Sequence, residues 1–267
     1  MHQPPITLLT DFGYADAYVG VMKGIIASID PTLNVIDLTH GIPPQNIAAA
    51  RFSLMSAYPY FPDGTVHVVV VDPGVGGQRR AIAIQLPTGM LVGPDNGVLS
   101  GVLAQVPPEV FPRVKAVQLT NPTYWRSPQP SSTFHGRDIF APVGAFLAKG
   151  VPFDHLGAPI EPDSLVNLPL PPVVAEGDRL QGCIQHSDQF GNLITNIPAS
   201  SIKTRNWQVQ AGEQLISRCP TYGDRAAGDL VALIGSHGWV EVAVNGGSAR
   251  AALGLETGDS VQVILRS

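Results

Sequence analysis

The pattern of apolar and polar residues changes about two thirds of the way along the chain. Up to about residue 165, short apolar runs alternate with segments in which apolar residues recur every three or four positions. The run at 66–71 is interrupted only by His67, which is typical of a strand buried on both faces of a parallel sheet. This order predicts an N-terminal α/β domain with a largely parallel sheet.

The individual elements of this domain follow from the same pattern. Asp16 is expected to cap the first helix, and Asp30 followed by Pro31 to end it. The predicted strands lie at 6–9, 35–38, 66–71, 81–86 and 90–92, and the predicted helices at 18–29, 48–58 and 138–149, with a short helix after Asn96.

A proline-rich segment, with Pro169, Pro171 and Pro172, separates this part from a different pattern. Beyond it, apolar and polar residues alternate within short runs, and turn signals such as Asn245-Gly246-Gly247 separate these runs. The expected strands lie at 180–185, 193–197, 207–209, 230–234, 239–244 and 261–265. We therefore expect two domains, an α/β domain at 1–168 and an all-β, barrel-like domain at 169–267.

The composition excludes several classes of protein. Of 267 residues, 44% are apolar and 14% are charged, which is too apolar for a disordered chain. The 28 glycines and 25 prolines exclude a helical bundle, because both residues destabilise helix interiors. A net charge of −5, without a basic stripe, argues against nucleic acid as a partner.

The expected location is the cytoplasm. The apolar runs are too short to cross a bilayer, and the N-terminal segment lacks the basic and apolar regions of a signal peptide. Two cysteines, Cys183 and Cys219, are too few for a disulfide framework or a four-cysteine zinc site. We expect both thiols to be reduced.

Polar residues follow two of the predicted strands. Asp11 comes directly after the first strand, where ligands bind in open α/β sheets, and its carboxylate suits vicinal ribose hydroxyls. Asp72 follows the valine-rich run and opens a glycine-rich loop that ends in Arg79 and Arg80. The alternatives are a turn or helix cap at Asp11 and a surface ion pair at Asp72. The loop lacks the Lys-Ser/Thr ending of a phosphate-binding loop.

A histidine completes this set. His135 lies between an aromatic residue and a glycine just before a helix, and alone such a histidine is more often structural than catalytic. Together with Asp72 and Arg79, it could bind and orient one water molecule. No pair of histidines at zinc-ligand spacing is present, so we expect neither a metal ion nor a cofactor.

Two polar loops stand out in the second domain. In the segment 187–197, Phe190 could stack on a purine and Asn192 could hydrogen-bond its edge, although a plain hairpin loop is the alternative. The second loop spans 236–239 and leads into the strand and turn at 241–249, where Gly246 belongs to a strong turn signal.

Six of these segments, in order, resemble one family. They are 10–13, 72–76 with Arg79, 94–97, 134–138, 190–192 and 236–249. The family is that of the S-adenosyl-L-methionine hydroxide adenosyltransferases, or adenosylmethionine hydrolases, which are related to the fluorinase and chlorinase enzymes. Members hydrolyse S-adenosyl-L-methionine to adenosine and L-methionine, by attack of an activated water or hydroxide on the ribose 5′ carbon.

The resemblance implies roles for particular residues. The water-activating triad would be Asp72, Arg79 and His135, although the sequence leaves open whether Arg79 or its neighbour Arg80 faces the site. Asp11 would bind the ribose. The other substrate-binding positions implied by the family are Phe134, Asp188, Phe190, Asn192, Ser236, Glu241, Val244 and Gly246.

The resemblance also implies an assembly, a homotrimer with the small-molecule substrate between the N-terminal domain of one subunit and the C-terminal domain of its neighbour. Because the complete triad is present, water is favoured over halide as the nucleophile. Two alternatives remain: a non-catalytic adenosine-binding module and a metal-dependent nucleotidase.

Overall fold

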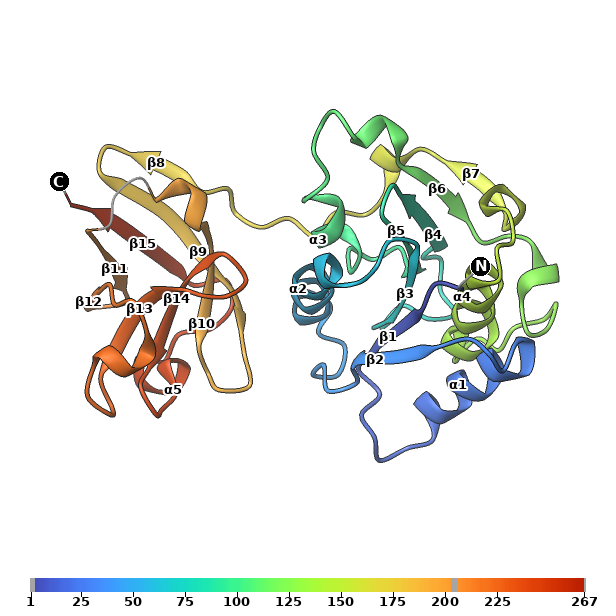
Figure 1. Cartoon of the computed structure of the whole chain (residues 1–267), viewed down its shortest axis with the longest axis horizontal. Coiled ribbons are helices and arrows are strands. Elements are labelled where there is room, and N and C mark those ends of the chain that lie inside the picture. Colours follow the sequence, from blue (N-terminus) through green and yellow to red (C-terminus); the bar gives the residue numbers. More distant parts are fainter. Residues whose placement is uncertain (1–2, 203–205, 267) are drawn as a thin grey trace. The chain divides into compact units, whose positions relative to one another are not determined.

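The computed structural model describes residues 3–202 and 206–266. The chain forms two compact units that meet in the sequence between Leu168 and Pro169, at the start of the proline-rich segment. Each unit is built around its own sheet, as Figure 1 shows.

The sheet of the first unit has the strand order β2-β1-β3-β5-β4-β6-β7. Its strands are β1 (Ile6–Thr10), β2 (Val35–Thr39), β3 (Thr65–Val70), β4 (Ala81–Leu86), β5 (Gly89–Pro94), β6 (Lys115–Gln118) and β7 (Ala158–Ile160). Only β4 and β7 run against the other five strands. The predicted α/β class with a largely parallel sheet is confirmed.

Helices cover both faces of this sheet (Figure 1). Val68 of β3 belongs to one core cluster with Met22 and Val143, and its neighbour Val69 belongs to another with Leu54. Successive side chains of a strand point to opposite faces, so a continuous valine run supplies both clusters. The helices are α1 (Tyr18–Ile29) and α4 (Ala141–Ala148) on one face, and α2 (Ile47–Ala57) and α3 (Ser100–Leu103) on the other.

Short helical turns complete the first unit. A π-helical turn, Gly136–Phe140, leads directly into α4. The 3₁₀ turns are Tyr58–Tyr60, Phe111–Arg113, Pro122–Tyr124, Phe153–His155 and Pro162–Ser164.

The second unit is an antiparallel, nearly closed barrel, as predicted. The strand order is β12-β11-β15-β9-β10-β14-β13, with β8 paired to β9. A bridge between Arg218 and Ala232 brings the two ends of this order together. Its elements are β8 (Val174–Glu176), β9 (Arg179–Ser187), β10 (Leu193–Pro198), β11 (Trp207–Ala211), β12 (Gln214–Ser217), β13 (Leu230–Ile234), β14 (Trp239–Val244), α5 (Ala249–Leu253), β15 (Ser260–Leu265) and the 3₁₀ turns Ala199–Ser201 and Tyr222–Asp224.

The sequence pattern missed the smallest elements. Strands β6, β7, β8 and β12 have three or four residues each. Except in β6, most of these residues are exposed or only partly buried. Such strands lack an apolar period, and backbone pairing rather than burial of side chains defines them. The predicted cap of α1 was also wrong, because the N-cap position is Ala17, which makes no side-chain cap bond.

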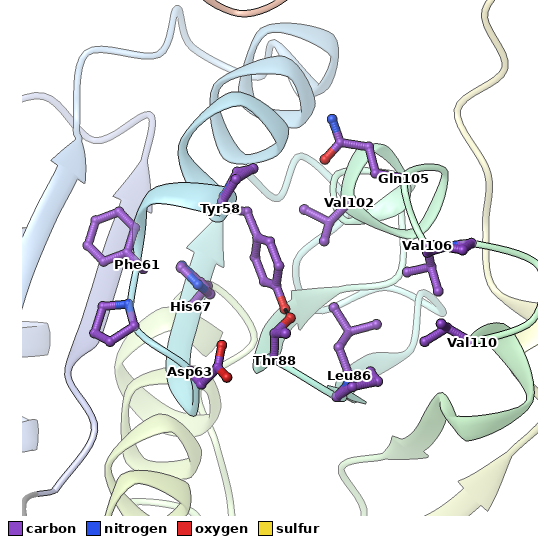
Figure 2. A pocket seen from close by; sticks show the side chains of 14 residues that line it. Tyr58, Phe61, Asp63, His67, Leu86, Thr88, Val102, Gln105, Val106 and Val110 are labelled. Atoms are coloured by element: carbon purple, nitrogen blue, oxygen red, sulfur yellow. Dashed lines mark hydrogen bonds between the residues drawn. The ribbon is translucent and has the colours of Figure 1, made fainter.

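A buried imidazole interrupts the valine run of β3. His67 is 1% exposed, its Nδ1 lies 2.8 Å from Thr7 Oγ1, and its ring packs between those of Tyr58 and Phe61. Figure 2 shows these rings beside a hollow of about 470 Å³ whose opposite wall includes Val106. Burial lowers the pKa of His67 to about 4. The ring is therefore neutral in the folded protein at neutral pH.

His67 makes the fold sensitive to acid. Its pKa is about 4 when folded and about 6.5 when unfolded, so only the unfolded chain takes up this proton between those pH values. We expect this group to lower the free energy of unfolding by roughly 3 kcal/mol as the pH falls from 7 to 4. Denaturant unfolding of the protein and of His67→Gln across this range measures the difference. Parallel pH profiles for the two proteins would contradict the assignment.

Candidate active site

The loop after β3 presents Asp72 at the carboxyl end of the strand. Within it, the backbone N–H of Val75 donates to the carbonyl of Asp72 at 3.2 Å. Gly76 has a φ of +74°, and a Cβ at this position would lie 2.1 Å from the carbonyl oxygen of Ser132. Only glycine therefore lets this loop lie against the segment that leads to His135.

Arg79 joins the carboxylate and the imidazole that the sequence proposed as a set. Its Nε donates to Asp72 Oδ1 at 2.9 Å and to Oδ2 at 3.0 Å, and its Nη2 forms a further bond to Oδ2. The same Nη2 lies 2.7 Å from His135 Nδ1. The side chains of Asp72 and Arg79 are only 4% and 11% exposed. Three groups that are far apart in the sequence thus form one contiguous cluster.

The arginine fixes the proton of the histidine. A guanidinium has no acceptor and stays protonated, so His135 Nδ1 must accept this bond. In the neutral ring the proton then sits on Nε2. Burial lowers the pKa of His135, and the positive charge of Arg79 lowers it further, while Asp72 and Asp138 oppose the shift. His135 is therefore neutral at pH 7.

The neighbouring Arg80 has a different partner. Its Nε donates to Asp95 Oδ2 at 2.7 Å, and its Nη1 donates to Ser164 Oγ at 3.1 Å. The other oxygen of Asp95 accepts the N–H of Val166 at 2.8 Å. Arg80 and Asp95 thus hold the segment around residue 165 against the sheet, and Arg79 is the arginine that meets His135.

Asp72 and His135 line a hollow of about 400 Å³, together with Asp11 and Phe134. Asp11 Oδ2 accepts the backbone N–H of Gln45 at 2.7 Å, and Asp11 Oδ1 has no hydrogen bond with the residues that the structure describes. The hollow combines an open carboxylate oxygen, an aromatic side chain and the Arg79 cluster. It can accept hydroxyl donors at one end and hold a polar small molecule or water at the other.

The aromatic wall of this hollow is a cluster of three rings. Phe134 meets Phe12 with 5.7 Å between ring centroids and Tyr18 with 5.2 Å, both edge to face. Edge-to-face contacts fix the ring planes and leave the exposed faces for a ligand. Of these three ring positions, only Phe134 was predicted from the sequence.

A second hollow, of about 480 Å³, belongs to the second unit. Asp188 holds its loop: one carboxylate oxygen accepts the N–H groups of Phe190 at 3.0 Å and Asn192 at 2.9 Å, and the other accepts Asn192 Nδ2 at 2.9 Å. Phe190 is 76% exposed. Five predicted positions line this hollow: Asp188, Phe190, Asn192, Val244 and Gly246.

Two predicted positions do not line it. Ser236 is exposed on the loop between β13 and β14, and Glu241 is buried. Glu241 accepts the hydroxyl of Tyr222 at 2.6 Å and lies 3.1 Å from His237 Nε2. Burial and the bond to Glu241 raise the pKa of Tyr222. Glu241 therefore acts on the hollow through Tyr222.

Tyr222 also lines the second hollow, although it was not predicted from the sequence. A local signal was present, because Thr221 and Asp224 have the spacing of a capping box and form one in the structure. The capping box predicts a helical turn there, but the approach of this turn to β14 depends on tertiary structure.

The described part of the chain contains neither a cluster of metal ligands nor a membrane-spanning helix. Among residues 3–202 and 206–266, no three His, Cys, Asp or Glu side chains come together as a metal site. Within the same residues, no helix has the length and apolar character needed to span a bilayer.

Comparison with known proteins gives consistent matches over both units. The model of the SAM hydroxide adenosyltransferase N-terminal domain matches residues 6–157, and that of the C-terminal domain matches 182–262. A relative from Salinispora tropica, named (R)-S-adenosyl-L-methionine hydrolase, is 42% identical over 261 residues, which cover 97% of each chain. A fluorinase from an Actinoplanes species is 26% identical over 295 residues and also covers 97% of each chain.

A solved structure shares the fold. The crystal structure of an uncharacterized conserved protein from Thermotoga maritima matches with a TM-score of 0.88 at 35% identity. The match covers 98% of this chain and 100% of that one.

The tautomer of His135 is directly measurable. We expect nitrogen NMR of the labelled imidazole at pH 7 to show a neutral ring with the proton on Nε2, because Arg79 donates to Nδ1. Asp72→Asn removes a charge that favours the imidazolium, so the pKa of His135 should fall further in this variant. A proton on Nδ1, or a charged ring at pH 7, would show that this geometry is wrong.

Proposed function

The chain belongs to the SAM hydroxide adenosyltransferase family, and from this premise we propose that it hydrolyses S-adenosyl-L-methionine to adenosine and L-methionine. The resemblance predicted from six sequence segments, including that to the fluorinases, is confirmed by the family models and relatives. The relative from Salinispora tropica is named for the (R) sulfonium epimer, and the proposal extends to that epimer.

One observation carries the proposal: Arg79 bridges Asp72 and His135 beside a hollow that also contains Asp11. A water molecule at this cluster would meet a carboxylate that accepts hydrogen bonds and an imidazole Nε2–H that donates one. The fixed positive charge of Arg79 favours hydroxide over water in this position. The cluster therefore suits the activation of water.

The chemistry needs a better nucleophile rather than help for the leaving group. Methionine leaves the sulfonium as a neutral thioether, so no acid is required. Water has a pKa of about 15.7 and is a weak nucleophile. In the proposed step, a lone pair of the water oxygen forms the bond to the 5′ carbon as the carbon–sulfur bond breaks. The electron pair of the carbon–sulfur bond passes to sulfur.

The proton of the attacking water goes to Asp72 in this proposal. His135 already carries its proton on Nε2 and donates a hydrogen bond to the water oxygen, so it orients the nucleophile. Arg79 holds both groups and stabilises the developing hydroxide. Acid–base assistance of this kind contributes about 10²–10⁴-fold to a rate.

The remaining predicted residues are assigned to substrate binding. Asp11 binds the ribose hydroxyls, and Phe134 provides an aromatic wall. Asp188, Phe190 and Asn192 bind other parts of the substrate in the second unit, and the other proposed binding positions there are Ser236, Glu241, Val244 and Gly246. Of these, Ser236 and Glu241 have the weaker support, because neither lines the hollow.

We propose a homotrimer in the cytoplasm. Each unit has its own open hollow, which supports a substrate shared between the N-terminal unit of one subunit and the C-terminal unit of its neighbour. Both cysteines are buried and unpaired, as suits a reducing compartment. Light scattering gives the assembled mass and tests the trimer. None of the relatives reported above is named as a nucleotidase or as an adenosine-binding module.

Two adjacent arginines provide a matched test of the triad. Arg79→Lys keeps the charge but loses the fork to Asp72 and the bond to His135, so we expect turnover of S-adenosyl-L-methionine to fall about 10²–10⁴-fold. Arg80→Lys keeps an ion pair with Asp95, outside the cluster, and should retain nearly full turnover. Chromatography of adenosine and methionine measures both rates, and calorimetry with adenosine checks that each variant still binds.

Two outcomes would count against this function. Nearly full turnover in both lysine variants would show that Arg79 has no role in the mechanism. Absence of adenosine release from either sulfonium epimer by the unmodified protein, despite tight adenosine binding, would favour a binding module.

A further inference from the structure

Asp11 lies in a turn that a buried histidine contacts on both sides. On one side, Thr10 Oγ1 accepts the N–H of Phe12 at 3.2 Å and lies 2.8 Å from His40 Nδ1. On the other side, the carbonyl of His40 accepts the N–H of Gly13 at 2.8 Å. The conformation of the turn is therefore coupled to the position of His40.

The segment after His40 also reaches the carboxylate itself. Five residues later, the N–H of Gln45 donates to Asp11 Oδ2 at 2.7 Å. Gln45 has a φ of +64°, in the left-handed region that non-glycine residues seldom adopt. The segment 40–45 thus forms a cradle that fixes one oxygen of Asp11.

A second carboxylate holds the imidazole. His40 is fully buried, and its Nε2 lies 3.1 Å from Asp37 Oδ1. Within the part of the chain that the structure describes, neither atom makes a hydrogen bond of standard geometry, so the 3.1 Å approach is a close contact between the imidazole and the carboxylate. The other oxygen of Asp37 accepts Lys23 Nζ at 2.7 Å.

The proton positions follow from these contacts. A bare imidazole lone pair facing a carboxylate would be repelled, so His40 carries a proton on Nε2. Thr10 Oγ1 already accepts the N–H of Phe12, which leaves its hydroxyl proton for His40 Nδ1. One continuous chain of contacts runs from Asp37 through His40 and Thr10 to the turn at Asp11.

We infer that His40, held by Asp37, is a positioning residue that orients the carboxylate of Asp11 for a vicinal diol. The inference rests on the proposed function, in which Asp11 binds the ribose. Thr10 and His40 are both fully buried, so they act through the turn and do not touch the substrate. Their effect is therefore confined to ligands that offer both ribose hydroxyls.

Replacing His40 by asparagine or by glutamine tests the two contacts of the imidazole one at a time. The amide of His40→Asn lies near the position of Nδ1 and can keep the bond to Thr10, whereas that of His40→Gln lies near Nε2 and can keep only the contact with Asp37. We expect adenosine to bind about 10-fold more weakly to the Gln variant, the effect of one hydrogen bond, and to lose less affinity in the Asn variant, which keeps the bond to Thr10 but lacks the contact with Asp37.

Calorimetry with two nucleosides distinguishes positioning from general damage. Adenosine and 2′,3′-dideoxyadenosine are titrated into the protein, His40→Asn, His40→Gln, Asp11→Ala and the Asp11→Ala, His40→Gln double variant. Positioning predicts that His40→Gln weakens only adenosine, and that it adds no further loss once Asp11 is absent. Equal weakening of both nucleosides, or additive losses in the double variant, would overturn the inference.

Two further measurements complete the design. Thermal melting shows whether the variants are folded, and Thr10→Val, which removes only the hydroxyl at similar size, repeats the test if the His40 variants do not fold. It should weaken adenosine alone, and equal effects on both nucleosides would again overturn the inference. Hydrolysis of S-adenosyl-L-methionine by the unmodified protein is scored separately, so failure of the proposed reaction is distinct from failure of the positioning role.

Discussion

The candidate site depends on the bonds that the largely buried guanidinium of Arg79 makes to Asp72 and His135. The guanidinium forms a fork on Asp72 and at the same time donates to His135. Burying an unpaired charge would cost several kcal/mol, so the carboxylate and guanidinium must remain together. Arginine suits this position because its planar donors reach two partners at fixed angles, which a lysine ammonium cannot do. The pair thereby sets the geometry and the tautomer of the histidine.

The fold brings these three groups together by ordinary means. The fully buried, valine-rich strand β3 ends at Val70, two residues before Asp72. The following loop lies against Ser132 at Gly76, and Arg79 comes just before the chain returns to the sheet at β4. His135 enters from the turn that precedes α4. Gly136 lies beside it, where a Cβ would come within 3.2 Å of Met22 Sδ and 3.3 Å of Val70. A side chain at Gly136 would therefore require these neighbours to shift slightly, whereas the contact of Gly76 with Ser132 leaves no room for one.

Much of this arrangement could be predicted from the sequence, because it follows from local patterns. A valine run predicts a buried strand, and a carboxylate directly after this run is predicted to lie at the carboxyl end of the strand, where ligands bind. The choice between Arg79 and Arg80 could not be made, since it depends on where Asp95 and Ser164 lie. Tyr222 and the exposed position of Ser236 were missed for the same reason: contacts between loops of a barrel have no periodic signal.

The origin of the new oxygen atom in adenosine tests the central claim most directly. The protein is incubated with S-adenosyl-L-methionine in ¹⁸O-labelled water, and the products are analysed by mass spectrometry. Activation of water beside Arg79 predicts one ¹⁸O atom in the 5′-hydroxyl of adenosine and unlabelled methionine. Unlabelled adenosine, or methylthioadenosine with the label in the amino-acid product, would contradict attack at the 5′ carbon.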